Sequence, residues 1–201
     1  MSMRSPLALT VTALSLLLFT CTLRGQSSAD LVQAQGLTRE VTLKASLARD
    51  CFVLREGKLG PIAPDSFAKT RLFVVYYTHI TCSLCVPVTK KLNAWLEAGK
   101  APDGVSFVLG YRAEADNAEL TAYVAKSGVL FPALDTKWIR ACRANAAVMH
   151  PFYADRDEGA PRFRFFRADG TEIDPTEHGA PTKFGGAIMN QLDDLLPKML
   201  K

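Results

Sequence analysis

Two cysteines stand three residues apart in this sequence, Cys82 and Cys85. A C-x-x-C pair of this kind can close to a disulfide and open to a dithiol, and its thiolate can act as a nucleophile. The pair directly follows an apolar run at residues 71–80 that lacks alternation and is rich in β-branched and aromatic side chains. Such a run predicts a strand buried on both faces, with the cysteines at its end.

Beyond the cysteines, apolar residues recur at helical spacing, which predicts an amphipathic helix from residue 83 to about residue 98. Cys82 would then lie at the helix N-terminus, where unpaired N–H groups and the helix dipole stabilise a thiolate. We therefore interpret Cys82 as the nucleophile and Cys85, one turn further in, as the residue that resolves a mixed disulfide. Pro87 should remove one hydrogen bond of the first turn and bend the helix start.

Metal binding is the main chemical alternative for this pair. A structural zinc site needs a second ligand pair at short spacing, but Cys21, Cys51 and Cys142 are isolated and the three histidines form no short pair. The sequence therefore favours redox chemistry and predicts no metal and no cofactor. Because copper(I) prefers soft thiolates, a copper or other soft-metal carrier that uses the dithiol with His79 stays an alternative.

The first 29 residues have the features of a secretory signal. Arg4 precedes an apolar run at residues 7–19, and residues 27–29 are small, as a signal peptidase requires. The run is short for a membrane span, although an uncleaved anchor and a lipid at Cys21 stay alternatives. We expect an exported chain, periplasmic or extracellular, that is bound to a membrane only if its N-terminus is retained or lipidated.

Export would change how the remaining cysteines are interpreted. Of the five cysteines, four would remain without Cys21, an even number in a compartment that permits disulfides. Cys51 and Cys142 could form a structural disulfide. Alternatively, each could be a packed thiol, since Cys142 shares a helical face with apolar residues.

Length and composition are those of one globular domain. The 201 residues are 48% hydrophobic, which is enough for a core, and the net charge of +4 includes no basic block interleaved with aromatic residues. Nucleic acid is therefore not an expected partner. We divide the chain into a signal peptide at 1–29, an N-terminal extension at 30–55 and a folded domain at 56–201.

The rest of the chain predicts alternating strands and helices, then a hairpin and a closing helix. These are a strand at 105–109, a helix at 116–126, an insertion at 132–150 with a helix at 137–148, strands at 162–167 and 171–173, and a helix at 187–200. Asp169 and Gly170 are a strong two-residue hairpin signal. Residues 30–70 are the least informative, with a short hairpin at 51–54 and 58–62.

This order of elements around a C-x-x-C helix resembles the thioredoxin fold. The resemblance implies that Ala160–Pro161, just before the hairpin, is a cis bond that faces the dithiol and aligns an extended peptide substrate. Three further motifs look like the tryparedoxin and nucleoredoxin branch. They are VVYY at 74–77, Ala122–Tyr123 together with FPAL at 131–134, and RADG at 167–170. The resemblance covers roughly residues 56–200.

The resemblance implies an α/β thioredoxin-like fold: a central mixed sheet flanked by helices, with the N-terminal extension and a helical insertion before the cis-proline strand. It also implies a thiol–disulfide oxidoreductase that acts on protein disulfides and is recycled by a redox partner. Cys82 would attack, and Cys85 would release the product. A non-enzymatic binding module on the same fold stays an alternative.

Some residues near the cysteines depart from the family pattern. Thr81 stands where that branch usually has tryptophan, and Tyr76 stands six residues before Cys82, where many thioredoxins bury an acid. His79 could stabilise the thiolate if its ring turns toward the sulfur, or it could face solvent. Arg162 and Arg164 should share one strand face, which could contact acidic substrates or simply be solvated.

Overall fold

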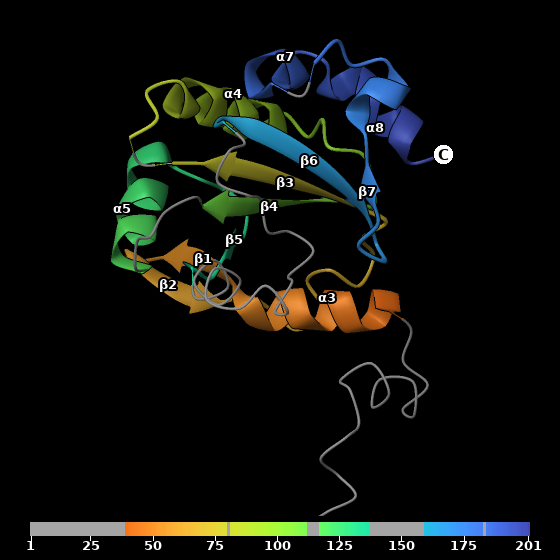
Figure 1. Cartoon of the computed structure of the whole chain (residues 1–201). Helices are drawn as coiled ribbons and strands as arrows, with labels where there is room; N and C mark the ends of the chain where they lie inside the picture. Colours follow the sequence, from red (N-terminus) through yellow and green to blue (C-terminus); the bar gives the residue numbers. More distant parts are fainter. Residues whose placement is uncertain (1–38, 80, 112–116, 137–158, 183) are drawn as a thin grey trace, which may run out of the picture. The chain divides into compact units, whose positions relative to one another are not determined.

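The computed structural model describes residues 39–201 except 80, 112–116, 137–158 and 183, and these residues belong to one compact unit (Figure 1). Its elements, in chain order, are α3 (Arg39–Asp50), β1 (Cys51–Arg55), β2 (Lys58–Pro61), β3 (Leu72–Thr78), α4 (Cys85–Glu97), β4 (Val105–Tyr111), α5 (Asn117–Ser127), β5 (Ala133–Leu134), β6 (Arg162–Arg167), β7 (Glu172–Ile173), the 3₁₀ helix η1 (Pro175–His178), α7 (Gly185–Met189) and α8 (Leu192–Met199).

The strands form one mixed sheet in the order β2-β1-β5-β4-β3-β6-β7. β3 pairs in parallel with β4 on one side and antiparallel with β6 on the other. Every residue of β3 is buried, so the predicted central strand is confirmed. The dithiol follows the end of this strand, at the middle of the sheet rather than at an edge.

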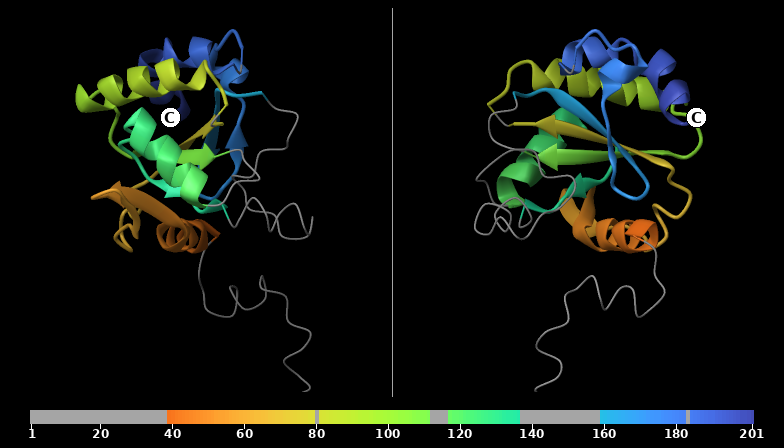
Figure 2. Two further views of the ribbon diagram at one scale, coloured as in Figure 1. Left: turned by 90° about the vertical axis from the view of Figure 1, so that its left-hand side faces the viewer. Right: turned by 45° about the vertical axis from the view of Figure 1, so that its right-hand side comes forward.

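Helices cover both faces of the sheet (Figures 1 and 2). Val74 and Tyr76 face the core that contains side chains of α4, α5, α7 and α8. Phe73, Val75 and Tyr77 face the second core, to which α3 contributes. The strand order, the parallel β3-α4-β4 unit and the β6–β7 hairpin with its closing helices confirm the predicted thioredoxin-like fold class.

Both predicted hairpins are present. β6 and β7 pair antiparallel around a turn in which Gly170 has a φ of 85° and donates its N–H to the carbonyl of Arg167. β1 and β2 pair antiparallel around Glu56 and Gly57, which have φ values of 50° and 77°. A positive φ at Gly57 is unstrained, whereas Glu56 accepts a conformation that L-residues rarely adopt.

Three expectations need correction or addition. The single closing helix predicted at 187–200 is wrong, because α7 ends before Asn190 and α8 starts at Leu192. The strand β5 lies inside the predicted insertion at 132–150, while the helix predicted there at 137–148 lies outside the described residues. The sequence did not predict α3, which lies in the least informative segment.

Among the helices that the structure describes, none combines the length and hydrophobicity needed to cross a bilayer. The predicted signal at residues 1–29 lies outside the described residues. The boundary at 29 therefore stays a prediction. The residues on both sides of the boundary predicted at 55 belong to one compact unit, since β1 and β2 pair across it.

Candidate redox site

The two cysteines lie at the start of α4, where the chain leaves the central strand. α4 begins at Cys85, two residues later than predicted, and Leu84 is its N-cap residue. The N–H of Cys85 donates to the carbonyl oxygen of Cys82 at 3.1 Å. Cys82 therefore lies in the turn that precedes the helix, and Cys85 is the first helical residue rather than one turn further in.

The later helix start also changes the role of Pro87, which becomes the third helical residue. The first four N–H groups of a helix have no acceptor within the helix. A proline at this position therefore removes no helical hydrogen bond. The prediction that Pro87 costs a first-turn hydrogen bond is wrong. Pro87 therefore gives no reason to expect a bent helix start.

The two sulfurs form a disulfide, with the Cα atoms of Cys82 and Cys85 5.3 Å apart. The two residues differ in access to solvent. Cys85 is 0% exposed, whereas Cys82 is only partly buried. A reagent as large as a protein can therefore reach the disulfide only from the side of Cys82.

The second part of the site is the Ala160–Pro161 peptide, which is cis as the resemblance implied. The carbonyl oxygen of Ala160 lies 3.6 Å from Sγ of Cys82, although the two residues are 78 positions apart in the sequence. The structure thus brings together the four residues predicted as catalytic or substrate-binding. Their roles remain predictions.

A glycine that the sequence analysis did not single out supports this arrangement. The N–H of Gly185, at the start of α7, donates to the carbonyl oxygen of Pro161 at 3.0 Å. A Cβ atom at Gly185 would lie 2.6 Å from that oxygen, closer than real Cβ contacts occur. Only glycine lets α7 approach so closely. A sequence signal existed, since Gly185 and Gly186 are adjacent and precede the predicted closing helix.

Two exposed apolar side chains lie in these segments, one between the cysteines and one directly before Gly185. Leu84, between the cysteines, is 58% exposed, and Phe184 is 49% exposed. Phe184 forms an antiparallel bridge with Arg162, the residue after Pro161. A polypeptide at the dithiol could therefore contact apolar surface.

His79, predicted as a residue that modulates the thiolate, contacts Thr81. Its Nδ1 atom lies 2.7 Å from Oγ1 of Thr81 and accepts the Thr81 N–H at 3.2 Å. The carbonyl oxygen of His79 accepts the N–H of Cys82 at 3.0 Å. The backbone of His79 thus helps to place Cys82, while an effect of its ring on the thiolate remains a prediction.

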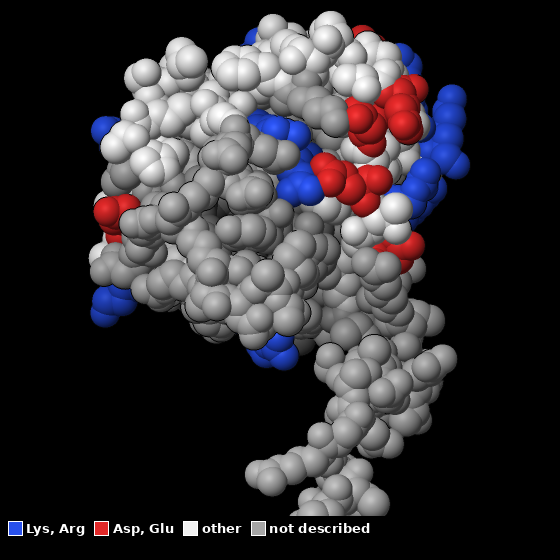
Figure 3. Space-filling model, viewed as in Figure 1, with Lys and Arg blue, Asp and Glu red and all other residues white. Residues whose placement is uncertain are grey.

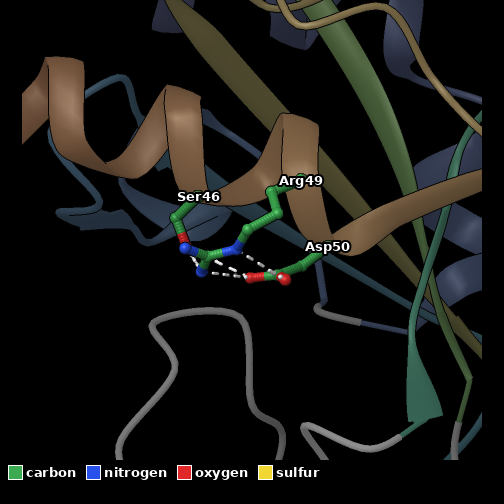
Figure 4. Close-up of polar contacts among 3 residues, drawn as sticks. All are labelled: Ser46, Arg49 and Asp50. Carbon is green, nitrogen blue, oxygen red and sulfur yellow. Dashed lines mark hydrogen bonds and ion pairs between the residues drawn. The ribbon is translucent and has the colours of Figure 1, made fainter.

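Cys51 carries a free thiol and is fully buried. Burial raises its pKa strongly, and the nearby carboxylate of Asp50 raises it further. That carboxylate accepts hydrogen bonds from Arg49 and Ser46 (Figure 4). The thiol is thus a packed, protonated group in this structure. Cys142 lies outside the described residues, so a disulfide between the two remains a prediction.

Arg164 of β6, one of the two arginines expected to share a strand face, is paired with an acidic residue. Arg164 is 15% exposed and binds Glu172 through two nitrogens, with Nε 2.7 Å from Oε1. Its guanidinium also lies 5.1 Å from the ring centroid of Phe166. On the face seen in Figure 3, acidic and basic side chains of the described residues lie beside one another. This favours a solvated, paired surface over a site for acidic substrates.

In the part of the chain that the structure describes, no three His, Cys, Asp or Glu side chains cluster as metal ligands would.

No protein-family model and no curated protein matches this sequence. Among solved structures, the chain is similar to tryparedoxin I from Crithidia fasciculata, at 17% identity over 67% of this chain and 85% of that one, with a TM-score of 0.47. It is similar to thioredoxin from Wuchereria bancrofti, at 17% identity over 64% and 82%, with a TM-score of 0.47. It is also similar to a secreted Mycobacterium tuberculosis disulfide oxidoreductase homologous to E. coli DsbE, at 20% identity over 64% and 83%, with a TM-score of 0.40.

Proposed function

We propose that this chain is an exported thiol–disulfide oxidoreductase that acts on protein disulfides, with Cys82 as nucleophile and Cys85 as resolving residue. One observation carries the proposal. The disulfide joins a partly exposed sulfur, next to the backbone of Ala160, to a sulfur with no exposed surface. This asymmetry suits a cycle in which the exposed cysteine forms the mixed disulfide with the substrate and the buried cysteine resolves it.

In the reducing direction, the thiolate of Cys82 attacks one sulfur of a substrate disulfide. A bond forms between Cys82 and that sulfur, and the other substrate sulfur leaves as a thiolate. The thiolate of Cys85 then attacks Sγ of Cys82, closes the internal disulfide and expels the second substrate thiolate. The substrate gains two electrons, the protein dithiol loses two, and the same steps in reverse oxidise a substrate dithiol.

Ala160 and Pro161 are the proposed contacts for the substrate backbone. Pro161 has no N–H, and its carbonyl oxygen already accepts the N–H of Gly185. The carbonyl oxygen of Ala160, 3.6 Å from Sγ of Cys82, points to where the scissile disulfide would lie. An extended peptide would form main-chain hydrogen bonds with the backbone at Ala160. Such bonds require no particular substrate sequence, so many protein disulfides could bind in this way.

Export forms part of the proposal and rests on the sequence of residues 1–29, with its early arginine, apolar run and small residues. It is tested by fractionating cells that express the tagged full chain. Recovery outside the cytoplasm at the size expected after cleavage supports export. A full-sized cytoplasmic chain contradicts it, and recovery with membranes points to a retained or lipidated N-terminus.

The catalytic proposal is tested by insulin-disulfide reduction with purified protein. Cys82→Ser should abolish turnover, because the attacking sulfur is gone. Cys85→Ala should trap a covalent adduct that dithiothreitol releases, because the mixed disulfide can no longer be resolved. Cys51→Ala is the matched control and should turn over normally, since that thiol has no surface exposed to a substrate. Normal turnover by Cys82→Ser would falsify the assignment.

A further inference from the structure

Four buried hydroxyl side chains lie between the central strand and the helices that follow it. Tyr76 and Thr78 belong to β3, Thr89 to α4 and Tyr123 to α5, and each is at most 2% exposed. Thr78 donates to Tyr123 at 2.6 Å, the hydroxyls of Tyr123 and Thr89 lie 2.9 Å apart, and Thr89 donates to Tyr76 at 3.1 Å. We call these four residues the hydroxyl cluster.

The hydroxyl cluster ends on the resolving cysteine. The hydroxyl of Tyr76 donates to the carbonyl oxygen of Cys85 at 3.0 Å. Because each hydroxyl has one proton, the distances fit a directed chain from Thr78 through Tyr123 and Thr89 to Tyr76 and then to Cys85. Thr89 can also donate directly to the same carbonyl at 2.9 Å. Hydrogen bonds in such a chain polarise one another.

The position of these bonds distinguishes them from ordinary helix contacts. A threonine that bonds the carbonyl four residues earlier is common in helices. The bond from Tyr76 is different, because it comes from the central strand and fixes the first residue of α4 to the sheet. Burial raises the pKa of Tyr76 above its ordinary value, so its hydroxyl stays a neutral donor at physiological pH.

We propose that the hydroxyl cluster positions Cys85 for the second exchange step, with Tyr76 as the positioning residue that contacts it. The proposal rests on the function proposed above. Two effects follow from the geometry. The donated bonds hold the peptide group of Cys85, so that its side chain keeps its direction toward Cys82. They also offset the negative end of the carbonyl dipole, which would otherwise oppose a thiolate on the same residue.

The step that the cluster serves is the attack of the Cys85 thiolate on Sγ of Cys82 in the mixed disulfide. The internal disulfide forms, the bond to the substrate sulfur breaks, and the electron pair leaves with the substrate thiolate. No bond in the hydroxyl cluster changes, and the cluster neither gains nor loses a proton. Its effect should therefore be confined to this second step.

The two steps can be observed separately with the aromatic disulfide 5,5′-dithiobis(2-nitrobenzoate). The reduced full chain is used in a background with Cys21→Ser and Cys142→Ser, so that only the pair and the buried Cys51 remain. Attack by Cys82 releases one coloured thiolate, and resolution by Cys85 releases a second. In Tyr76→Phe, we expect an unchanged first phase and a second phase about three- to tenfold slower, as for one lost hydrogen bond.

Matched variants separate positioning from general loss of structure. Tyr77→Phe removes a hydroxyl from the neighbouring residue, whose side chain faces the other core, and should leave both phases unchanged. Thr89→Val removes a donor and should slow the second phase, while Thr89→Ser keeps the hydroxyl and should behave like the wild type. If Tyr76→Phe does not fold, this threonine pair still tests the proposal.

Slowing confined to the second phase in Tyr76→Phe and Thr89→Val supports the proposal. An unchanged second phase in both variants overturns it, and so does an equal slowing of both phases. Failure of the underlying function looks different. In that case the wild-type pair itself releases no second thiolate, whatever residue stands at position 76.

Discussion

Gly185 offers the sharpest test of how the fold positions the redox site. A Cβ atom there would lie 2.6 Å from the carbonyl oxygen and 2.7 Å from the carbonyl carbon of Pro161. Both are backbone atoms, so the contact cannot be relieved by rotating a side chain. In Gly185→Ala, the start of α7 must therefore move away from Pro161, and the 3.0 Å hydrogen bond between them is lost.

The size of the effect follows from these contacts. Overpacking a well-packed site costs about 1–3 kcal/mol, and losing one hydrogen bond costs about 0.5–1.5 kcal/mol. The higher helix propensity of alanine relative to glycine stabilises the variant by about 1 kcal/mol and offsets part of this cost. We expect the free energy of unfolding to fall by about 1–3 kcal/mol. For a domain of this size, the middle of that range corresponds to a Tm lower by about 4–8 °C.

The matched control is the adjacent glycine. A Cβ atom at Gly186 would meet only Cε1 of Phe184, at 3.9 Å, so Gly186→Ala should be neutral or slightly stabilising. Urea unfolding compares the two variants, and insulin reduction reports the site. Gly185→Ala should also exchange more slowly, because the Ala160 carbonyl shifts relative to Cys82. Equal stability and equal exchange rates in both variants would refute the reasoning.

Two further predictions concern the buried interior. Burial holds the pKa of Cys51 above its ordinary value of 9.0, so the folded state retains the proton longer than the unfolded state does. This contribution to stability is complete below about pH 9 and is lost as pH rises further. The free energy of unfolding of Cys51→Ala, measured in urea at a series of pH values, should therefore fall less steeply above about pH 9 than that of the wild type. A Cβ atom at Gly110 would lie 2.6 Å from the ring of Tyr77. The free energy of unfolding of Gly110→Ala, measured in urea, should therefore be about 1–3 kcal/mol lower than that of the wild type. The colour-forming exchange of its dithiol should be unchanged while the variant is folded, and a fully stable Gly110→Ala would contradict this packing.

The elements with strong periodic or turn signals could be predicted from the sequence. The unbroken apolar run at 72–77 became the fully buried β3, because helices cover both faces of the sheet there. Asp169 and Gly170 predicted the hairpin that β6 and β7 form. The break between α7 and α8 could not be predicted, since the apolar spacing continues across Asn190 and Gln191 and only packing decides where a helix stops.

The site was only partly predictable, for a reason of topology. The spacing of Cys82 and Cys85 is local, so the pair could be recognised without a fold. The hydroxyl cluster is not local. Thr78, Thr89 and Tyr123 are ordinary residues in their own elements, and their hydroxyls meet only because β3, α4 and α5 pack together. The place of Pro161 opposite the dithiol was inferred from the family resemblance alone.

The complete burial of Cys85 has a consequence for kinetics. If electrons enter and leave only through the sulfur at position 82, the protein that is reduced and the protein that restores the dithiol must use the same surface in turn. The two partners would then compete with each other, and raising the concentration of either one would eventually inhibit the cycle.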